Sequence, residues 1–243
     1  MSTFYSTNLK SSSDNLVLLL DSTNTKSYPG NGITWFDLSG SGNHATMYGS
    51  VPLTTDVVSC WDFSGVTSPT GYSSAASLGF TFSAPINYPT NSYTFEAWVK
   101  NPPASIGQCG LCSNAGSGDG FRFGIAQAGI YYLCGPTYTE GGINYVTSYD
   151  NSKWHHIVAV FDRRGIYNGS PSIFLYKDGV YEASASLPAS QTAQGTGITG
   201  LVRVATGNPL YTGKLAKFCV YSTALTANQI LSNYNATKGR YGR

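Results

Sequence analysis

The sequence carries little charge, since Asp, Glu, Lys and Arg make up only 11% of its 243 residues, against about a quarter in ordinary globular proteins. It has only three glutamates, Glu96, Glu140 and Glu182. No uninterrupted apolar run exceeds five residues, as in 16–20 and 157–161, whereas a membrane-spanning helix needs about twenty. These shortages argue against a coiled coil, a helical bundle and insertion into a membrane.

The few charges nearly balance, with 14 lysines and arginines against 12 aspartates and glutamates. Three positive charges, Lys238, Arg240 and Arg243, lie in the last six residues, so the whole excess lies there. Elsewhere no basic cluster suits binding to phosphates, which argues against nucleic acid as a partner. A short basic tail is either solvated or docked against an acidic neighbour, and the sequence leaves both open.

Met1 is not followed by a charged segment and then an apolar one, so we expect no secretion signal. The cysteines are odd in number, and together with the missing signal this argues against a disulfide framework. Cys109 and Cys112 have the spacing of a redox or zinc half-site. However, Pro102-Pro103 before them and the glycine-rich 114–120 after them do not suit a redox motif. Free structural thiols are therefore expected at Cys60, Cys109, Cys112, Cys134 and Cys219.

Many short strands are indicated by the 28 glycines, the 18 tyrosines and the 41% of hydrophobic residues. Apolar segments bounded by Gly, Pro, Asn or Asp predict the clearest strands at 93–100, 121–126, 154–162, 172–178 and 214–221.

Alternation within these strands predicts which residues share a face. In 93–100 it places Phe95 on one face, and Glu96 with Trp98 on the other. In 214–221 the same rule places Leu215 with Lys217, on the face opposite Ala216, Phe218 and Val220.

One helix is expected near the end of the chain, where Thr226 and Gln229 form a capping box and Ile230 begins an apolar stripe. Asp178-Gly179 predicts a two-residue hairpin turn. Together these patterns predict an all-β sandwich of two antiparallel sheets with one short C-terminal helix. Its expected parts are an N-terminal arm at 1–14, the sandwich at 15–237 and a basic tail at 238–243.

Several motifs in this order resemble laminin-G-like domains of the concanavalin A-like lectin/glucanase superfamily. They are Trp35-Phe-Asp-Leu-Ser-Gly-Ser-Gly-Asn-His-Ala-Thr46, Phe95-Glu-Ala-Trp-Val-Lys100, 154–162, 174–180 and 213–234. The resemblance implies a jelly-roll fold whose members mostly bind glycans or proteins, often with calcium, while a minority hydrolyse polysaccharides. The ending at 234–242 is similar to that of laminin-G-like proteins in bacteriophage and other large-virus structural genes.

The chemistry of hydrolysis does not suit this chain. Glycosidases need two carboxylates flanking the scissile bond, and the Glu-x-Asp-x-x-Glu strand of the glucanase branch is absent; Glu96-Ala-Trp98 lacks the second carboxylate. His155 and His156 are adjacent, so they point to opposite faces of a strand and cannot share a metal. We expect them to be hydrogen-bonded strand residues, and we expect no enzyme.

Candidate binding residues come from aromatic side chains, which stack on sugar rings beside polar groups that fix orientation. Trp98 lies on the polar face of its strand beside Glu96 and is a candidate for a concave sheet, although packing beneath a loop would explain it equally. The tyrosines in a glycine-rich stretch could form a rim or finish the core, namely Tyr131, Tyr132, Tyr138 and Tyr145.

Calcium prefers several oxygen ligands from loops, which Asp37 with Asn43, or Asp119, could supply. Each of these residues could instead form a turn with its own backbone. Many relatives have an acidic pair where this chain has Ala216-Lys217, and this departure argues against calcium at that position.

The prediction is a non-catalytic virion component, a surface decoration or adhesion module with a lectin-like glycan- or protein-binding face. It would be made in the host cytoplasm and lie on the exterior of the virion. Its expected partners are other virion proteins, copies of itself and a cell-surface glycan. The alternative is a free-standing cellular lectin.

Overall fold

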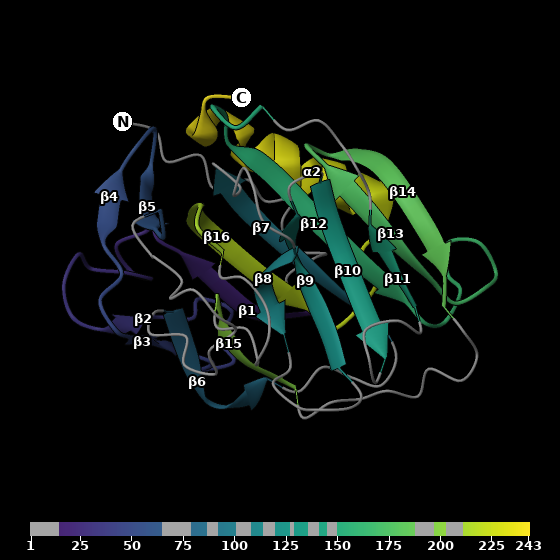
Figure 1. The fold of residues 1–243 in the computed structure, drawn as a ribbon, viewed down its shortest axis with the longest axis horizontal. Helices are drawn as coiled ribbons and strands as arrows, with labels where there is room; N and C mark the ends of the chain where they lie inside the picture. The colour runs from purple at the N-terminus through teal and green to yellow at the C-terminus, as the bar shows by residue number, and fades with distance from the viewer. Residues whose placement is uncertain are drawn as a thin grey trace.

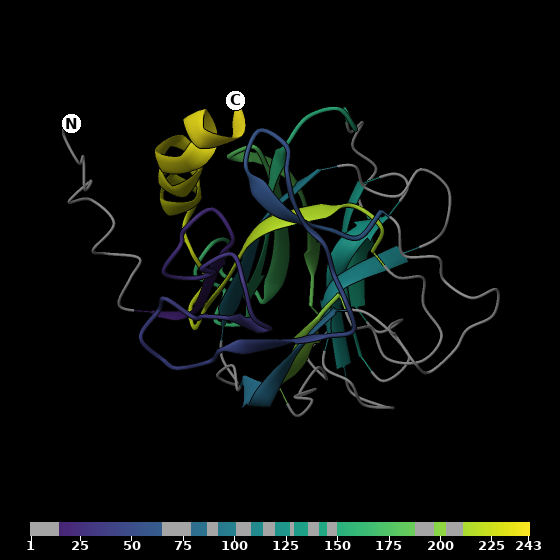
Figure 2. The same cartoon turned by 90° about the vertical axis from the view of Figure 1, so that its left-hand side faces the viewer.

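The computed structural model describes residues 15–64, 79–86, 92–100, 108–113, 120–126, 129–135, 141–144, 150–187, 197–202 and 211–243. Within these residues the chain forms two antiparallel sheets packed face to face, with a helix outside one of them (Figures 1 and 2). The predicted sandwich with one short C-terminal helix is therefore confirmed.

Sheet I runs in the order β14-β13-β12-β7-β16-β5-β4, and β1 also pairs with β16. Its strands are β1 (Leu16–Asp21), β4 (Leu53–Thr55), β5 (Ser59–Asp62), β7 (Tyr93–Lys100), β12 (His155–Asp162), β13 (Ser172–Lys177), β14 (Val180–Ser186) and β16 (Lys214–Tyr221).

Sheet II runs in the order β11-β10-β9-β8-β15-β6-β3-β2. Its strands are β2 (Thr34–Trp35), β3 (Ala45–Tyr48), β6 (Gly79–Ile86), β8 (Gln108–Ser113), β9 (Gly120–Ala126), β10 (Gly129–Gly135), β11 (Gly141–Asn144) and β15 (Ile198–Leu201).

The main core lies between the two sheets. Phe95 of β7 points into it and stacks on Phe123 of β9 and Phe218 of β16, with ring centroids 5.8 and 6.4 Å apart. Alternate residues of β12, among them Ile157 and Ala159, enter the same core. The inner face of sheet I is thus apolar along its central strands, as the alternation in 93–100 predicts.

The predicted alternation of β16 is wrong at its start. A β-bulge shifts the register between Leu215 and Lys217 opposite β7. Leu215 therefore joins the main core with Phe218, whereas Ala216 turns outward to pack with Trp98. One extra residue in a bulge reverses the face of everything on one side of it, which a strict period of two cannot anticipate.

The expected hairpin and helix cap are both present. Asp178 and Gly179 have φ of +52° and +79°, as a two-residue turn with two left-handed residues requires. Helix α2 (Ala227–Thr237) begins at the Thr226–Gln229 capping box. A side chain at Gly179 would stand 3.0 Å from atoms of Leu231 and Tyr234, so the hairpin also needs glycine to let α2 approach.

Helix α2 and the short helix η2 (Lys238–Tyr241) lie on the outer face of sheet I, away from sheet II (Figure 2). Residues 238–243 are not simply solvated, because Tyr241 is buried and both arginines pair with aspartates of the same chain. The acidic neighbours of this tail are thus Asp21 and Asp178.

No helix among the described residues is long and apolar enough to cross a membrane. The cysteines whose side chains are described, Cys60, Cys112 and Cys219, are buried free thiols, as expected.

Candidate functional site

The outer face of sheet I brings together the polar residues predicted to bind a ligand. Glu96 and Trp98 alternate with core residues along β7 and so point outward. The register sets Trp98 between Lys217 of β16 and His156 of β12. Three strands thus supply one row of side chains beneath α2.

Glu96 is fully buried and is held from several sides. Its Oε1 accepts a hydrogen bond from Lys217 Nζ at 3.1 Å. Its Oε2 accepts from Asn233 Nδ2 of α2 at 2.8 Å and from Tyr221 Oη at 3.3 Å. Burial alone would raise the pKa of this carboxyl, but Lys217, His156 and Asn233 outweigh it and hold the pKa far below its ordinary value.

His156 differs from the hydrogen-bonded strand residue that the sequence predicts. It is fully buried, and its Nε2 lies 3.4 Å from Glu96 Oε1. The alignment is too poor for a hydrogen bond, and neither ring nitrogen has a hydrogen-bond partner among the described residues. The ring packs against Trp98 and Tyr234, with centroids 5.3 and 5.9 Å away.

His155, the neighbouring residue in β12, makes polar contacts as expected. Its Nδ1 lies 2.8 Å from Asp178 Oδ2, and its Nε2 lies 3.2 Å from the Asp150 carbonyl oxygen. Both of these neighbours, a carboxylate oxygen and a carbonyl oxygen, are hydrogen-bond acceptors. The adjacent histidines do not share a site.

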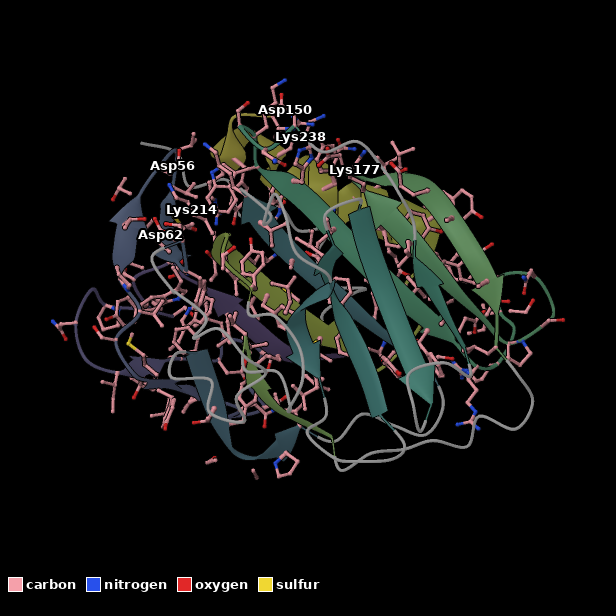
Figure 3. The ribbon with its side chains drawn as sticks, viewed as in Figure 1. Asp56, Asp62, Asp150, Lys177, Lys214 and Lys238 are labelled. Carbon is pink, nitrogen blue, oxygen red and sulfur yellow. The ribbon has the colours of Figure 1, made fainter. Side chains whose placement is uncertain are left out.

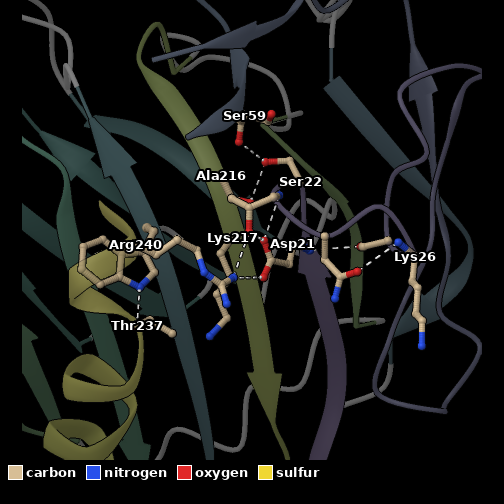
Figure 4. Close-up of polar contacts among 12 residues, drawn as sticks. Asp21, Ser22, Lys26, Ser59, Ala216, Lys217, Thr237 and Arg240 are labelled. Carbon is tan, nitrogen blue, oxygen red and sulfur yellow. Dashed lines mark hydrogen bonds and ion pairs between the residues drawn. The ribbon is translucent and has the colours of Figure 1, made fainter. Parts of the chain in front are cut away.

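Trp98 is also fully buried, and its ring stacks on that of Tyr241 with centroids 4.0 Å apart and planes 6° apart. Its Nε1 donates to Thr237 Oγ1 at 3.1 Å (Figure 4). In this arrangement neither Trp98 nor Glu96 reaches solvent. Their predicted role in ligand binding stays a prediction, and it would require the helical cover to leave.

The predicted tyrosines fall partly on sheet II. Tyr131 and Tyr132 are consecutive in β10, where they pair with Gly124 and Phe123 of β9. Tyr138 and Tyr145 lie outside the described residues.

The predicted calcium loop is tied to the protein itself. Asp37 Oδ1 accepts from the N–H groups of Leu19 and Ser39, and its Oδ2 accepts from Ser39 Oγ and Asn43 N–H, at 2.8 to 3.0 Å. Asn43 Nδ2 donates to the Val17 carbonyl. This is the turn alternative that the sequence left open, and calcium binding here stays a prediction.

Asp119 lies outside the described residues. No group of three or more His, Cys, Asp or Glu side chains suited to a metal occurs in the part of the chain that the structure describes.

Other carboxylates in the described sheets form ion pairs with lysine side chains. Near the ends of β4, β5 and β16, Asp56 and Asp62 lie about Lys214 (Figure 3), which is 3.1 Å from Asp56 and 3.9 Å from Asp62. Lys100 adds a second contact to Asp56 at 2.9 Å.

Two acidic anchors on the outer face could not be identified from the sequence, which left open only that the tail docks against some acidic neighbour. Asp21 accepts from Arg240 Nη1 at 3.0 Å (Figure 4), and Asp178 accepts from Arg243 Nη2 at 2.8 Å. The pattern Asp178-Gly179 predicts only a turn, so the pairing of Asp178 with Arg243 was not predicted. Burial alone would raise the pKa of Asp178, but His155, the His156 N–H and Arg243 lower it below its ordinary value.

Comparison with known proteins identifies the fold. A family model described as the concanavalin A-like lectin/glucanases superfamily, of laminin G type, matches residues 72–231. The chain belongs to this superfamily. No curated protein sequence matches it.

Solved structures similar to this superfamily member include two binding domains of botulinum neurotoxins and one structure of botulinum neurotoxin type C. The serotype D binding domain has a TM-score of 0.69 at 14% identity, covering 93% of this chain and 53% of that one. The serotype DC binding domain, solved with rat synaptotagmin II, has a TM-score of 0.67 at 14% identity, with 93% and 52% covered.

A type C structure, whose title describes cell entry dependent on two ganglioside molecules, has a TM-score of 0.67 at 13% identity, with 94% and 52% covered. The chain thus spans about half the length of these structures. At such identity the likeness concerns the fold, a jelly-roll sandwich of the lectin type.

Proposed function

We propose that this chain is a non-catalytic binding module on the exterior of a virion, where its lectin-like sandwich presents a glycan- or protein-binding face. Membership of a superfamily rich in binding domains supports the binding role. The similar neurotoxin domains support it further, since their titles name a protein, synaptotagmin, and a glycolipid, ganglioside. The virion location is supported by the resemblance of residues 234–242 to viral structural proteins.

The environment of Glu96 carries the non-catalytic part of this proposal. Its four partners in the described part of the chain are Lys217, His156, Tyr221 and Asn233, and none is a second carboxylate. A general acid needs a raised pKa and an approach for substrate. Glu96 has a lowered pKa and no exposed surface. We expect no release of reducing ends from β-glucans.

The ligand face is proposed on sheet II, because α2 and η2 cover the outer face of sheet I (Figure 2). Tyr131 and Tyr132 are consecutive in β10, so alternation places only one of them on the outer face of the sheet, and that residue is the candidate contact. A glycan array together with binding to intact host cells tests this face. We expect saturable binding that one of the two variants Tyr131→Ala and Tyr132→Ala weakens, while exposed Tyr181→Ala leaves it unchanged. Unchanged binding in both β10 variants would contradict the proposed face.

The location requires a separate experiment, namely counting copies of the chain in purified particles and labelling the intact surface with an antibody. Labelling of intact particles supports a decoration or adhesion module. Absence from particles, combined with saturable glycan binding, would instead favour a free-standing cellular lectin.

A further inference from the structure

Residues 238–243 occupy a built pocket on the outer face of sheet I. The Tyr241 ring is 2% exposed and lies flat on Trp98, with its centroid 5.5 Å from that of Trp154. Val58 and Ala216 close the pocket, which belongs to an apolar cluster separate from the main core. The pocket thus accepts one aromatic ring.

Two carboxylates on separate elements of sheet I flank this aromatic pocket. Asp21, at the end of β1, binds Arg240, which also donates to Thr23 Oγ1 at 2.9 Å. Asp178, in the β13–β14 turn, binds Arg243. The pocket therefore recognises a specific pattern, an aromatic residue with an arginine directly before it and another two residues after it.

The segment that fills the pocket is attached to the sheets through side chains. The backbone hydrogen bonds of residues 238–243 run within the segment, from the Gly242 N–H to the Gly239 carbonyl and from the Arg243 N–H to the Lys238 carbonyl, or back to α2 at the Tyr234 carbonyl. No backbone bond to a strand is found among the described residues.

The seated segment also leaves polar atoms unsatisfied. Tyr241 Oη and Trp154 Nε1 are both buried without a hydrogen-bond partner in the described residues, and such groups disfavour the arrangement that buries them. The pocket matches the ring and the two arginines well, but it holds the segment less firmly than a strand of the sandwich would be held.

We propose that the pocket bounded by Trp98, Trp154, Asp21 and Asp178 is an acceptor site for an arginine–tyrosine segment, filled by residues 238–243 within one chain and by the same segment of a second copy when copies assemble. Exchange of an identical element needs no new contact, because each pocket keeps the same ligand. This rests on the proposed function only in that a virion surface module is present in many copies.

Complementary variants test the exchange. The donor variant, Asp21→Asn with Asp178→Asn, keeps the segment but weakens the pocket. The acceptor variant, Arg240→Ala with Tyr241→Ala and Arg243→Ala, keeps the pocket but lacks the segment. In analytical ultracentrifugation each is expected to be monomeric alone and to form a one-to-one heterodimer when mixed. A mixture that stays monomeric into the millimolar range overturns the exchange.

A peptide measurement tests the pocket itself, even if copies pack poorly. The labelled peptide Lys-Gly-Arg-Tyr-Gly-Arg should bind the acceptor variant saturably. It should bind the acceptor variant that also carries Asp21→Asn and Asp178→Asn at least about tenfold more weakly, because the charge-assisted contacts are lost. The same peptide with Ala for Tyr is the control and should not bind. Equal binding of the peptide to both variants overturns the proposed recognition. Neither measurement involves a glycan, so a negative glycan array leaves this inference intact.

Discussion

On its inner face sheet I packs against another sheet, and on its outer face it packs against an 11-residue helix and the short segment that follows. The inner contact is a continuous set of aromatic and aliphatic side chains. The outer contact has two smaller apolar clusters, with the buried Glu96–Lys217 pair on the same face. The inner face is therefore stabilised by a large buried apolar area, and the outer face by a few specific side chains.

This difference teaches that a fully buried face need not belong to the global core. Removing apolar contacts on the inner face should destabilise the whole sandwich. Removing one partner on the outer face should leave a buried charge or a loosened cover, with effects that depend on pH or on the chemistry of the replacement. Four substitutions sharpen this contrast.

The largest effect is expected at the centre of the inner face. Phe95→Ala removes a ring that stacks between the two sheets and leaves a cavity, so we expect the free energy of unfolding to fall by about 4 kcal/mol. Urea denaturation followed by tryptophan fluorescence measures it. Exposed Tyr181→Ala is the control and should change little. A loss for Phe95→Ala below that of the outer-face variants would contradict the contrast.

On the outer face, Glu96→Gln should cost about 3 kcal/mol at neutral pH, because it leaves the Lys217 ammonium without its counter-ion. Replacing both partners, as Glu96→Gln with Lys217→Met, should recover part of that loss. Glu182→Gln is a matched control, since its 3.6 Å pair with Lys177 is partly exposed and such pairs contribute about 1 kcal/mol or less. Equal losses of the free energy of unfolding in Glu96→Gln and Glu182→Gln would contradict the prediction.

The pH dependence of Glu96→Gln has a definite sign. The native pKa of Glu96 lies below its ordinary value of 4.5, so its stabilising contribution is complete above that pH and is lost as the pH falls. The gap between the parent chain and Glu96→Gln should therefore narrow below pH 4.5, by up to about 1.4 kcal/mol per pH unit. A gap that stays constant down to pH 2.5 would contradict this assignment.

An intermediate effect is expected where the hairpin meets α2. Gly179→Ala forces a side chain into a left-handed residue and against Leu231 and Tyr234, so we expect a loss of about 2 kcal/mol. Gly169→Ala is the matched control, because Gly169 has the same φ of +79° but nothing within 4 Å. The difference between the losses in the two variants measures the contact with α2 alone. If the losses are equal, α2 moves aside without a measurable cost.

The smallest effect is expected at the start of α2, the helix that covers the outer face of sheet I. Thr226→Ala removes the hydroxyl that caps α2 and should cost about 1 kcal/mol. Circular dichroism during thermal unfolding measures the shift in midpoint. Thr226→Ser is the control, since it keeps the hydroxyl and should be nearly neutral. A loss in Thr226→Ser as large as in Thr226→Ala would show that the cap bond is not the cause.

The inner face of sheet I, the hairpin turn and the start of α2 could be predicted from the sequence because each depends on local patterns. Alternation in 93–100, the Asp178-Gly179 turn and the Thr226–Gln229 capping box each need only neighbouring residues, and all three are present. The bulge before Lys217 was missed, because its register is set by the facing strand and not by its own sequence.

The outer face could be predicted only in part. Alternation places Glu96 and Trp98 outward, but it does not tell whether solvent, a ligand or the chain itself covers them. The partners of these two residues, Asn233 and Tyr241, lie more than 130 residues away in sequence. The pairing of Arg240 with Asp21 joins residues 219 apart, and no local pattern specifies such a contact.

Native-state hydrogen exchange tests most directly whether the two faces of sheet I open independently. The amides of Gly242 and Arg243 bond only within their own segment, so we predict that they exchange by local opening, at a lower free energy than the amides of β7 and β12 and without dependence on urea. The amides of β7 and β12 should exchange only on global unfolding. If all four groups shared one free energy and one urea dependence, the outer cover would be part of the global core, and the account would be wrong.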